Sequence, residues 1–321
     1  MSSSPVLSVV VPVYNEEECL PAFHRELSAI LRSQVEPYEI VYVDDGSQDR
    51  SLELVESLRL SDPNVRAVVL TRNFGHQLAL TAGLEFSRGE AVVTMDADLQ
   101  HPPSLIPRML AEWRKGARVV STVRTDTEDI GACKRLTSRL FYGLINALSR
   151  TPVQPDAADF RLLDRGAVET LRSMKERHRF LRGMIGWLGL PEAVIEFSAG
   201  RRAAGASKYT WARMFSFAAD GIVSFSTLPL KAALILGSLA LGLCGLYAGY
   251  VVYMFAFHGV LLIKGWASTV LLTMFLGGCQ LILLGVTGEY IGRIYEEIKA
   301  RPLFLVRELR GFAGRAPEPG R

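Results

Sequence analysis

The stretch "LSVVVPVYNEEE", residues 7–18, sets the fold class of the first part of the chain. It begins with a nearly unbroken run of valine and leucine, which is typical of a parallel strand buried on both faces. The three glutamates that follow suit the first turn of a helix, whose partial positive charge attracts carboxylates. Asn15 is a residue type that caps helices. We therefore predict a buried strand followed closely by a helix that Asn15 caps.

Strand-like and helix-like patterns continue to alternate through residue 98. Strands are predicted in "YEIVYVDDGS", "VRAVVLTRN" and "EAVVTMDAD", and helices in "SLELVESLRL" and "HQLALTAGLEFSRG". This β-α-β-α order predicts an α/β fold with an open, mostly parallel sheet and flanking helices. In such sheets ligands bind outside the carboxyl ends of the strands.

Two aspartates, Asp96 and Asp98, follow the last of these strands in "AVVTMDADLQHPP". Side chains at positions i and i+2 of a strand point to the same face, so the two carboxylates would project together. Like charges this close are unfavourable unless a cation lies between them. A divalent cation bound to phosphate oxygens would satisfy both, whereas the alternative is a plain solvated turn. Tyr14 and Asp45 fall at the same predicted sheet edge, which favours a binding site.

Composition and missing motifs exclude several classes of function. The net charge of the 321-residue chain is only +3, so nothing indicates a nucleic-acid partner. The sequence contains no phosphate-binding G-x-x-x-x-G-K loop, no G-x-G-x-x-G fingerprint after the first strand and no H-E-x-x-H zinc motif. Its four cysteines form no C-x-x-C pair, which indicates reduced, structural thiols.

Two apolar runs dominate the last third of the chain. Residues 232–257 and 265–288 contain no charged side chain. Each run exceeds the roughly 20 apolar residues that span a bilayer, so we predict two membrane spans rather than two buried helices of a soluble domain. The small residues of "LGLCGLYAG" would let such helices approach closely. This feature favours self-association into a homo-oligomer.

Basic residues predict the orientation of these spans. Lys231 precedes the first run and Arg293 follows the second, whereas the connecting "HGVLLIKG" carries only Lys264. The positive-inside rule then places both termini in the cytoplasm. The amino terminus lacks the charged and apolar regions of a signal peptide. We expect a multi-pass protein of a bacterial-type inner (plasma) membrane with a cytoplasmic catalytic domain.

Five motifs, taken in order, resemble the inverting nucleotide-sugar glycosyltransferases of the GT-A fold: "VVVPVYNEEE", "VDDGSQDRS", "RNFGHQLALTAGL", "MDADLQHPP" and "DFRLLDR". With "RRAAGASKY" and the two apolar runs, the chain resembles the polyprenyl-phosphate glycosyltransferases, such as the bactoprenol glucosyltransferases and dolichol-phosphate mannose synthases. The resemblance implies four parts: a cytoplasmic GT-A domain over 1–205, a juxtamembrane amphipathic segment over 206–228, a transmembrane hairpin over 229–291 and a cytoplasmic basic tail over 292–321.

The resemblance also implies a nucleotide-sugar site. Its residues would be Pro12, Tyr14, Glu16, Val43, Asp45, Asp96, Ala97, Gln100, Arg202 and Lys208. Within this set Tyr14 would face the base and Asp45 would accept a hydrogen bond from it. Asp44, which is outside the set, would brace the turn. Asp96 and Asp98 would hold Mg²⁺ or Mn²⁺ against the diphosphate.

The implied acceptor is a polyprenyl phosphate, which Arg124 and Arg135 would bind. Asp159 occupies the position of the family's catalytic acid. Asp98, as a metal ligand, is the second residue to which the resemblance assigns a catalytic role. A phosphate monoester is already an anion at neutral pH, so it needs positioning more than deprotonation. We expect transfer of a single hexose, with UDP-glucose the favoured donor. Two alternatives remain: a transferase acting on a lipid or glycan hydroxyl with Asp159 as general base, and an inactive membrane scaffold or transporter subunit.

Overall fold

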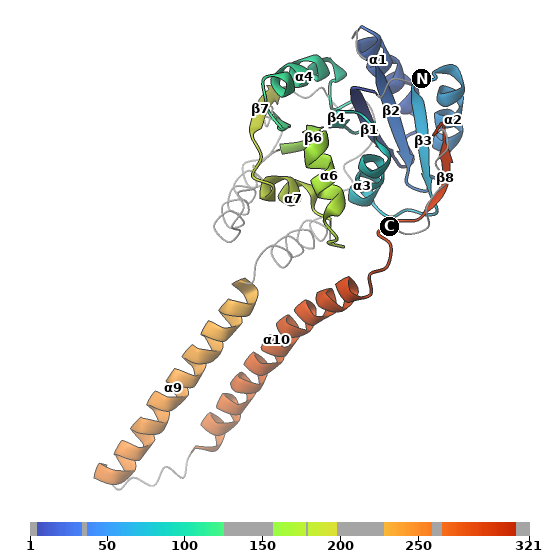
Figure 1. Cartoon of the computed structure of the whole chain (residues 1–321). Helices are drawn as coiled ribbons and strands as arrows, with labels where there is room; N and C mark the ends of the chain where they lie inside the picture. Colours follow the sequence, from blue (N-terminus) through green and yellow to red (C-terminus); the bar gives the residue numbers. More distant parts are fainter. Residues whose placement is uncertain are drawn as a thin grey trace. The chain divides into compact units, whose positions relative to one another are not determined.

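A computed structural model describes residues 5–33, 37–124, 157–177, 179–197, 228–258 and 265–312 (Figure 1). The chain forms two compact units, one made of Met1–Thr210 together with Arg301–Arg321 and the other of Trp211–Ala300. The first unit therefore contains the predicted catalytic domain together with residues that follow the second apolar run.

The first unit is built on a sheet that, in the described part of the chain, has the strand order β7-β5-β6-β4-β1-β2-β3-β8. Its strands are β1 (Leu7–Val13), β2 (Tyr38–Asp44), β3 (Val65–Leu70), β4 (Ala91–Thr94), β5 (Val119–Arg124), β6 (Ala157–Asp164), β7 (Glu192–Phe197) and β8 (Val306–Arg310). The neighbours β4, β1, β2 and β3 are mutually parallel, whereas β6 and β8 run antiparallel to the strands beside them. The predicted open, mostly parallel sheet is confirmed.

Helices cover both faces of this sheet. They are α1 (Leu20–Arg32), α2 (Ser51–Ser61), α3 (His76–Phe86), α4 (Ile106–Arg114), α6 (Arg165–Ser173) and α7 (Leu181–Trp187), with a short 3-10 turn η1 (Pro103–Leu105) before α4. Residues of α1, α2 and α4 share one buried cluster, and residues of α3, α6 and α7 share another. Every residue of β1 is buried because it lies between these two layers.

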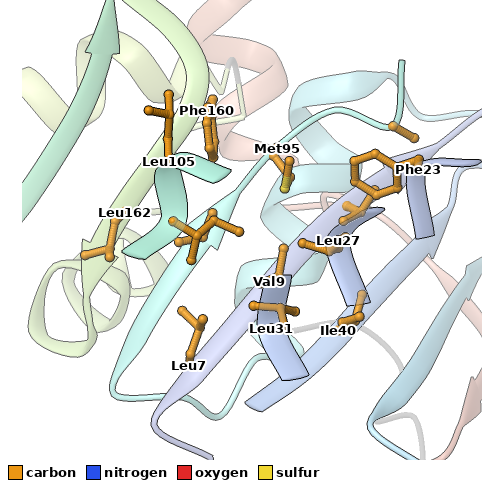
Figure 2. Packing of buried hydrophobic residues seen from close by; sticks show 14 of the residues in the cluster. Leu7, Val9, Phe23, Leu27, Leu31, Ile40, Met95, Leu105, Phe160 and Leu162 are labelled. Carbon is orange, nitrogen blue, oxygen red and sulfur yellow. The ribbon is translucent and has the colours of Figure 1, made fainter. Parts of the chain in front are cut away.

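Figure 2 shows the first of the two clusters, in which β1 packs against α1. Leu7 and Val9 from the strand lie with Phe23, Leu27 and Leu31 from the helix. The valine-rich run of β1 supplies apolar side chains to both layers, which is the reason that a strand without alternation is stable at this position.

The predicted capping of α1 by Asn15 is wrong. The helix begins at Leu20, and Cys19 in the cap position makes no side-chain capping bond. Asn15 has a φ of 55°, in the left-handed region, and its Oδ1 accepts a hydrogen bond from Gln48 N at 2.8 Å. Because this amide is engaged across the loop, it cannot cap the helix, and the glutamates occupy the loop instead.

Helix α3 packs unusually close to the centre of the sheet. Gly83 faces β1 and β2, and a Cβ built there would overlap Val10 Cγ1 and lie 3.1 Å from Val43 Cγ2. Residue 83 must therefore be a glycine for α3 to lie at this depth. The amino end of the same helix carries residues of the candidate site.

The last strand, β8, comes from the segment that we predicted as a basic tail. It pairs antiparallel with β3, with Leu309 opposite Val68. Just before the strand, Leu305 O accepts a hydrogen bond from Thr71 N at 3.0 Å. Arg310 also contacts Glu56 of α2 at 3.1 Å. This part of the tail is thus the outer strand of the catalytic sheet (Figure 1).

The second unit contains the long helices α9 (Leu228–His258) and α10 (Trp266–Ile298). Windows over Gly237–Met254 and Leu272–Ile298 have a mean hydropathy of 1.4, so both helices are long and apolar enough to cross a membrane. The prediction of two apolar helices is confirmed. The two helices contact each other, and a Cβ added at Gly237 would lie 3.7 Å from Leu283 Cδ1. Except for its last residue, the predicted amphipathic segment 206–228 lies outside the described residues.

Candidate active site

The loops that follow β1, β2 and β3 are joined into one layer at the carboxyl edge of the sheet. Asn15 N donates to Ser47 Oγ at 3.2 Å, which links the first two loops. Gly46 links the second loop to the third, since a Cβ at this position would lie 2.6 Å from the carbonyl carbon of Arg72. Its φ of 72° is a second reason for glycine. These contacts hold the three loops together at the carboxyl edge of the sheet.

Asp44 and Asp45 are both buried within this layer, each with 2% exposure. Asp44 Oδ1 accepts from Ser47 N at 3.2 Å and so braces its own turn. The Asp45 carboxylate accepts from Phe74 N at 2.7 Å and from Gly75 N at 2.9 Å. Burial raises the pKa of Asp45, although the two backbone hydrogen bonds oppose this shift. Asp45 thus anchors the loop that leads into α3, and its contact with a base stays a prediction.

His76, the first residue of α3, reaches the carboxylate that follows β4. Its Nε2 donates to Asp96 Oδ1 at 2.7 Å. Burial alone would raise the pKa of Asp96 and lower that of His76, but their hydrogen bond and mutual charge dominate. The pKa of Asp96 therefore lies below its ordinary value and the pKa of His76 lies above it. The hydrogen bond thus stabilises the carboxylate form of Asp96 and the protonated form of His76.

His101 supports Asp96 from the other side. Its Nδ1 accepts a hydrogen bond from Asp96 N at 3.1 Å, and its ring stacks on Phe160 with 5.3 Å between centroids. Because Nδ1 accepts, the ring proton of neutral His101 is on Nε2. The 3.8 Å approach of Nδ1 to Asp96 Oδ2 is then no ion pair, and that oxygen stays available for another ligand.

A tight turn places Asp98, Gln100 and Arg124 together. Asp98 Oδ1 accepts from Gln100 N at 3.1 Å, and Leu99 between them has a φ of 61°. A bulky residue in the left-handed region is strained, and such residues gather at functional sites. Arg124, at the end of β5, donates from Nη1 to Gln100 Oε1 at 3.3 Å. The structure thus brings a predicted acceptor-binding arginine to a predicted donor-site residue.

Asp159, near the start of β6, is held by residues of two helices. Arg182 Nε of α7 donates to Oδ1 at 2.8 Å, and Gln77 Nε2 of α3 donates to Oδ2 at 3.3 Å. His76 Nδ1 lies 3.9 Å from Oδ2, so His76 stands between Asp159 and Asp96. Burial favours the neutral acid, but the charge and hydrogen bond of Arg182 outweigh it and hold the pKa of Asp159 below its ordinary value.

The donor set at this edge fits a hard divalent cation. Among the described residues no cluster of three or more His, Cys, Asp or Glu side chains could enclose a metal by itself. Mg²⁺ is usually held by one or two carboxylates together with substrate phosphates and water, and not by an all-protein cage. Asp96 and Asp98 provide such carboxylates.

The other predicted site residues fall into three groups. Tyr14 is 41% exposed, so its ring is accessible to a ligand. Glu16 is half-buried, whereas Pro12, Val43 and Ala97 are buried. Arg135, Arg202 and Lys208 lie outside the described residues. The binding roles of all these residues stay predictions.

Sequence reasoning missed three residues that the structure brings to the site, namely His76, Gln77 and Arg182. The first two belong to the motif "RNFGHQLALTAGL", which follows a predicted parallel strand. Their position at the carboxyl edge was the available signal. Arg182 follows no such strand, and nothing in the sequence ties it to Asp159.

Comparisons with known proteins cover almost the entire chain. Residues 8–172 match the family model described as Glycosyl transferase family 2. The uncharacterized glycosyltransferase YkcC of Bacillus subtilis is 40% identical over 97% of this chain and 96% of its own length. The bactoprenol glucosyl transferase of Shigella phage SfX is 39% identical over 94% of this chain and 98% of its own length. These similarities include both apolar helices as well as the sheet.

Solved structures show a more distant likeness of fold. Mannosyl-3-phosphoglycerate synthase from Rubrobacter xylanophilus superposes with a TM-score of 0.47 at 19% identity, covering 68% of this chain and 72% of that chain. Such a likeness carries no information about the substrate of this chain.

Proposed function

The chain belongs to glycosyl transferase family 2, as its motifs predict, and from this we propose that it transfers one hexose from a nucleotide sugar to a polyprenyl phosphate at a membrane. UDP-glucose is the donor that we favour. The observation that carries the proposal is the set of hydrogen-bonded acidic and basic side chains at the carboxyl edge of the sheet, in a chain that also contains two long apolar helices. Family membership argues against the scaffold and transporter alternatives.

Each part of the edge has a function in this reaction. Asp96 and Asp98 would hold Mg²⁺ or Mn²⁺, which would offset the charge of the leaving nucleoside diphosphate. Tyr14 offers an exposed ring to the base. Arg124 lies beside Gln100 and would orient the acceptor phosphate, because a guanidinium can bind two phosphate oxygens at once.

Asp159 is better suited to orientation than to proton abstraction. Its pKa lies below the ordinary value, so its carboxylate is a weak base near neutral pH. A polyprenyl phosphate needs no base, since its nucleophilic oxygen is already anionic. A hydroxyl acceptor would need one. Both oxygens of Asp159 already accept hydrogen bonds, from Arg182 and Gln77, and this arrangement fits the phosphate acceptor better than a hydroxyl that must be deprotonated.

The two apolar helices would hold the catalytic unit at the bilayer, where the lipid acceptor resides. Basic residues before the first helix and after the second favour a cytoplasmic location for both of their outer ends. The donor, a soluble nucleotide sugar, would then reach the site from the cytoplasm.

A transfer assay tests this proposal. The full chain, purified in detergent, is incubated with Mg²⁺, radiolabelled UDP-glucose and undecaprenyl phosphate, and the lipid extract is separated by thin-layer chromatography. We expect a labelled lipid product with the phosphate and none with undecaprenol, which differs only in having a hydroxyl. UDP-galactose and GDP-mannose serve as alternative donors.

Loss of the metal site should abolish this transfer. We expect Asp96→Asn and Asp98→Asn to be nearly inactive, and excess EDTA to stop the wild-type enzyme until Mg²⁺ or Mn²⁺ is restored. Full turnover by either variant, or in EDTA, would overturn the metal assignment. Label transferred to undecaprenol instead of its phosphate would establish the hydroxyl-acceptor alternative.

A further inference from the structure

The carboxylate of Asp159 is fixed by hydrogen bonds from two helices that lie on the same face of the sheet. Arg182 of α7 binds one oxygen at 2.8 Å and Gln77 of α3 binds the other at 3.3 Å. We propose that Arg182 and Gln77 are positioning residues, which act on the reaction by holding Asp159 in one orientation beside His76. This inference rests on the transferase function proposed above.

Gln77 connects all three elements at this point. While its Nε2 donates to Asp159, its Oε1 accepts from Leu181 N, the first amide of α7, at 3.2 Å. The first amides of a helix have no partner within the helix, so Gln77 satisfies one of them. An amide that donates and accepts at once has a single orientation. The position of Asp159 is therefore coupled to the start of α7 and to α3.

Arg182 supplies the charge that this position needs. The side chain of Asp159 is only 14% exposed, and that of Arg182 is 30% exposed. Removing one member of a poorly solvated ion pair leaves the other uncompensated, which is strongly unfavourable. Without Arg182, the Asp159 carboxylate would turn towards water or bind a proton. Either change would remove a fixed negative group from the site.

A double-mutant cycle distinguishes this role from direct substrate binding. We expect Arg182→Gln to lower kcat by about 10²-fold, the scale of loss that follows from small misplacement of reacting groups, with little change in KM for UDP-glucose. Because Arg182 acts through Asp159, the variant Arg182→Gln/Asp159→Asn should be no slower than Asp159→Asn alone. Arg182→Lys should recover part of the loss, since it restores the charge without the planar fork.

A parallel variant tests the donor group of Gln77. Gln77→Glu keeps an acceptor for Leu181 N but places a repelling oxygen against Asp159. It should lower kcat as Arg182→Gln does. The matched control is Arg172→Gln, at a residue whose side chain is 24% exposed. It breaks an ion pair of the same 2.8 Å length between α6 and Glu85 of α3, together with a second ion pair to Glu169. This control should leave kcat unchanged.

Melting temperatures provide a cycle that does not depend on turnover. The variant Arg182→Gln/Asp159→Asn should lose less in Tm than the sum of the losses of the two single variants. Each single variant already breaks the same ion pair, so the second substitution does not break it again. Multiplicative losses in kcat with additive losses in Tm would overturn the proposal, as would a rise in KM for UDP-glucose with unchanged kcat. If the wild-type chain transfers no sugar to any polyprenyl phosphate, the proposed function fails, whereas the Tm cycle still decides whether Arg182 and Asp159 act together.

Discussion

His76 is the residue that connects the two central carboxylates. Its Nε2 binds Asp96 at 2.7 Å, and its Nδ1 lies 3.9 Å from Asp159 Oδ2. His76 occupies Oδ1 of Asp96, and the second oxygen, Oδ2, lies 3.8 Å from His101 Nδ1. Groups that hydrogen-bond to a metal-ligating carboxylate fix its direction and commonly affect metal affinity.

We expect His76→Ala to weaken metal binding at Asp96. The predicted loss is about 10- to 100-fold in Mn²⁺ affinity, as for other outer partners of metal ligands. Electron paramagnetic resonance titration of Mn²⁺ with the full chain in the presence of UDP measures it without any turnover. His76→Gln retains a donor and should recover part of the affinity. An unchanged Mn²⁺ affinity in His76→Ala would show that His76 has no such role.

The acidic residues of the site could be predicted, but their partners could not. Asp96, Asp98 and Asp159 belong to motifs of the resembled family. Strand β4 ends at Thr94, so the strand periodicity that would place Asp96 and Asp98 on one face does not extend to them. Gln77 and Asp159 are 82 positions apart in the chain, and neither periodicity nor spacing relates them. Their contact depends on the pairing of β6 with β4 and on the packing of α3 against β1 and β2. That placement is a tertiary property, which local sequence patterns do not encode.

The depth at which α3 lies on the sheet depends on Gly83. We expect Gly83→Ala to reduce the free energy of unfolding by about 1–3 kcal/mol through overpacking against Val10. The gain in helix propensity, about 1 kcal/mol, offsets this only in part. Chemical denaturation of the purified chain measures the difference.

Shortening the facing side chain is the control for this substitution. In the double variant Gly83→Ala/Val10→Ala, the methyl group added at position 83 would fill the space left by the shortened side chain of residue 10. Its loss in unfolding free energy should therefore be smaller than the sum of the losses of the two single variants. Additive losses would mean that Gly83 is required for some reason other than its contact with Val10.

The elements of the sheet differ in how well their sequences mark them. The apolar runs of β1 and β2 lie between two helix layers, and that burial is visible in their composition. Strand β8, "VRELR", mixes charged and apolar side chains on both faces and has no buried residue. It is stable because β3 offers an unpaired edge, and Arg310 also pairs with Glu56. The sequence of β8 therefore predicts a basic tail, because the strand depends on its pairing with β3 and not on its own composition.

The pairing of β8 with β3 also constrains the topology of the molecule. One sheet contains strands from before α9 and from after α10, so in the proposed membrane arrangement the outer ends of these two helices must lie on the same side. Two crossings satisfy this requirement and one crossing does not. This argument is independent of the distribution of basic residues and requires only that both outer ends lie on one side, whichever side that is.

Cysteine labelling tests this topology. In a variant without the four native cysteines, Leu262→Cys should react with a membrane-impermeant maleimide in intact spheroplasts, because it would lie in the outer loop. Ala316→Cys should react only after permeabilisation. The opposite pattern, or protection of both positions in intact spheroplasts, would contradict two crossings with a cytoplasmic sheet.

The late position of β8 in the chain has a consequence for biosynthesis. Strand β3 ends at Leu70, whereas β8 begins at Val306, after both apolar helices have been translated. At roughly 5–20 residues per second, the edge of β3 remains open on the nascent chain for tens of seconds. An open strand edge invites pairing with other chains. The sheet can therefore be completed only after both apolar helices have been synthesised, so the order of the elements in the chain makes β8 the last part of the enzyme to form.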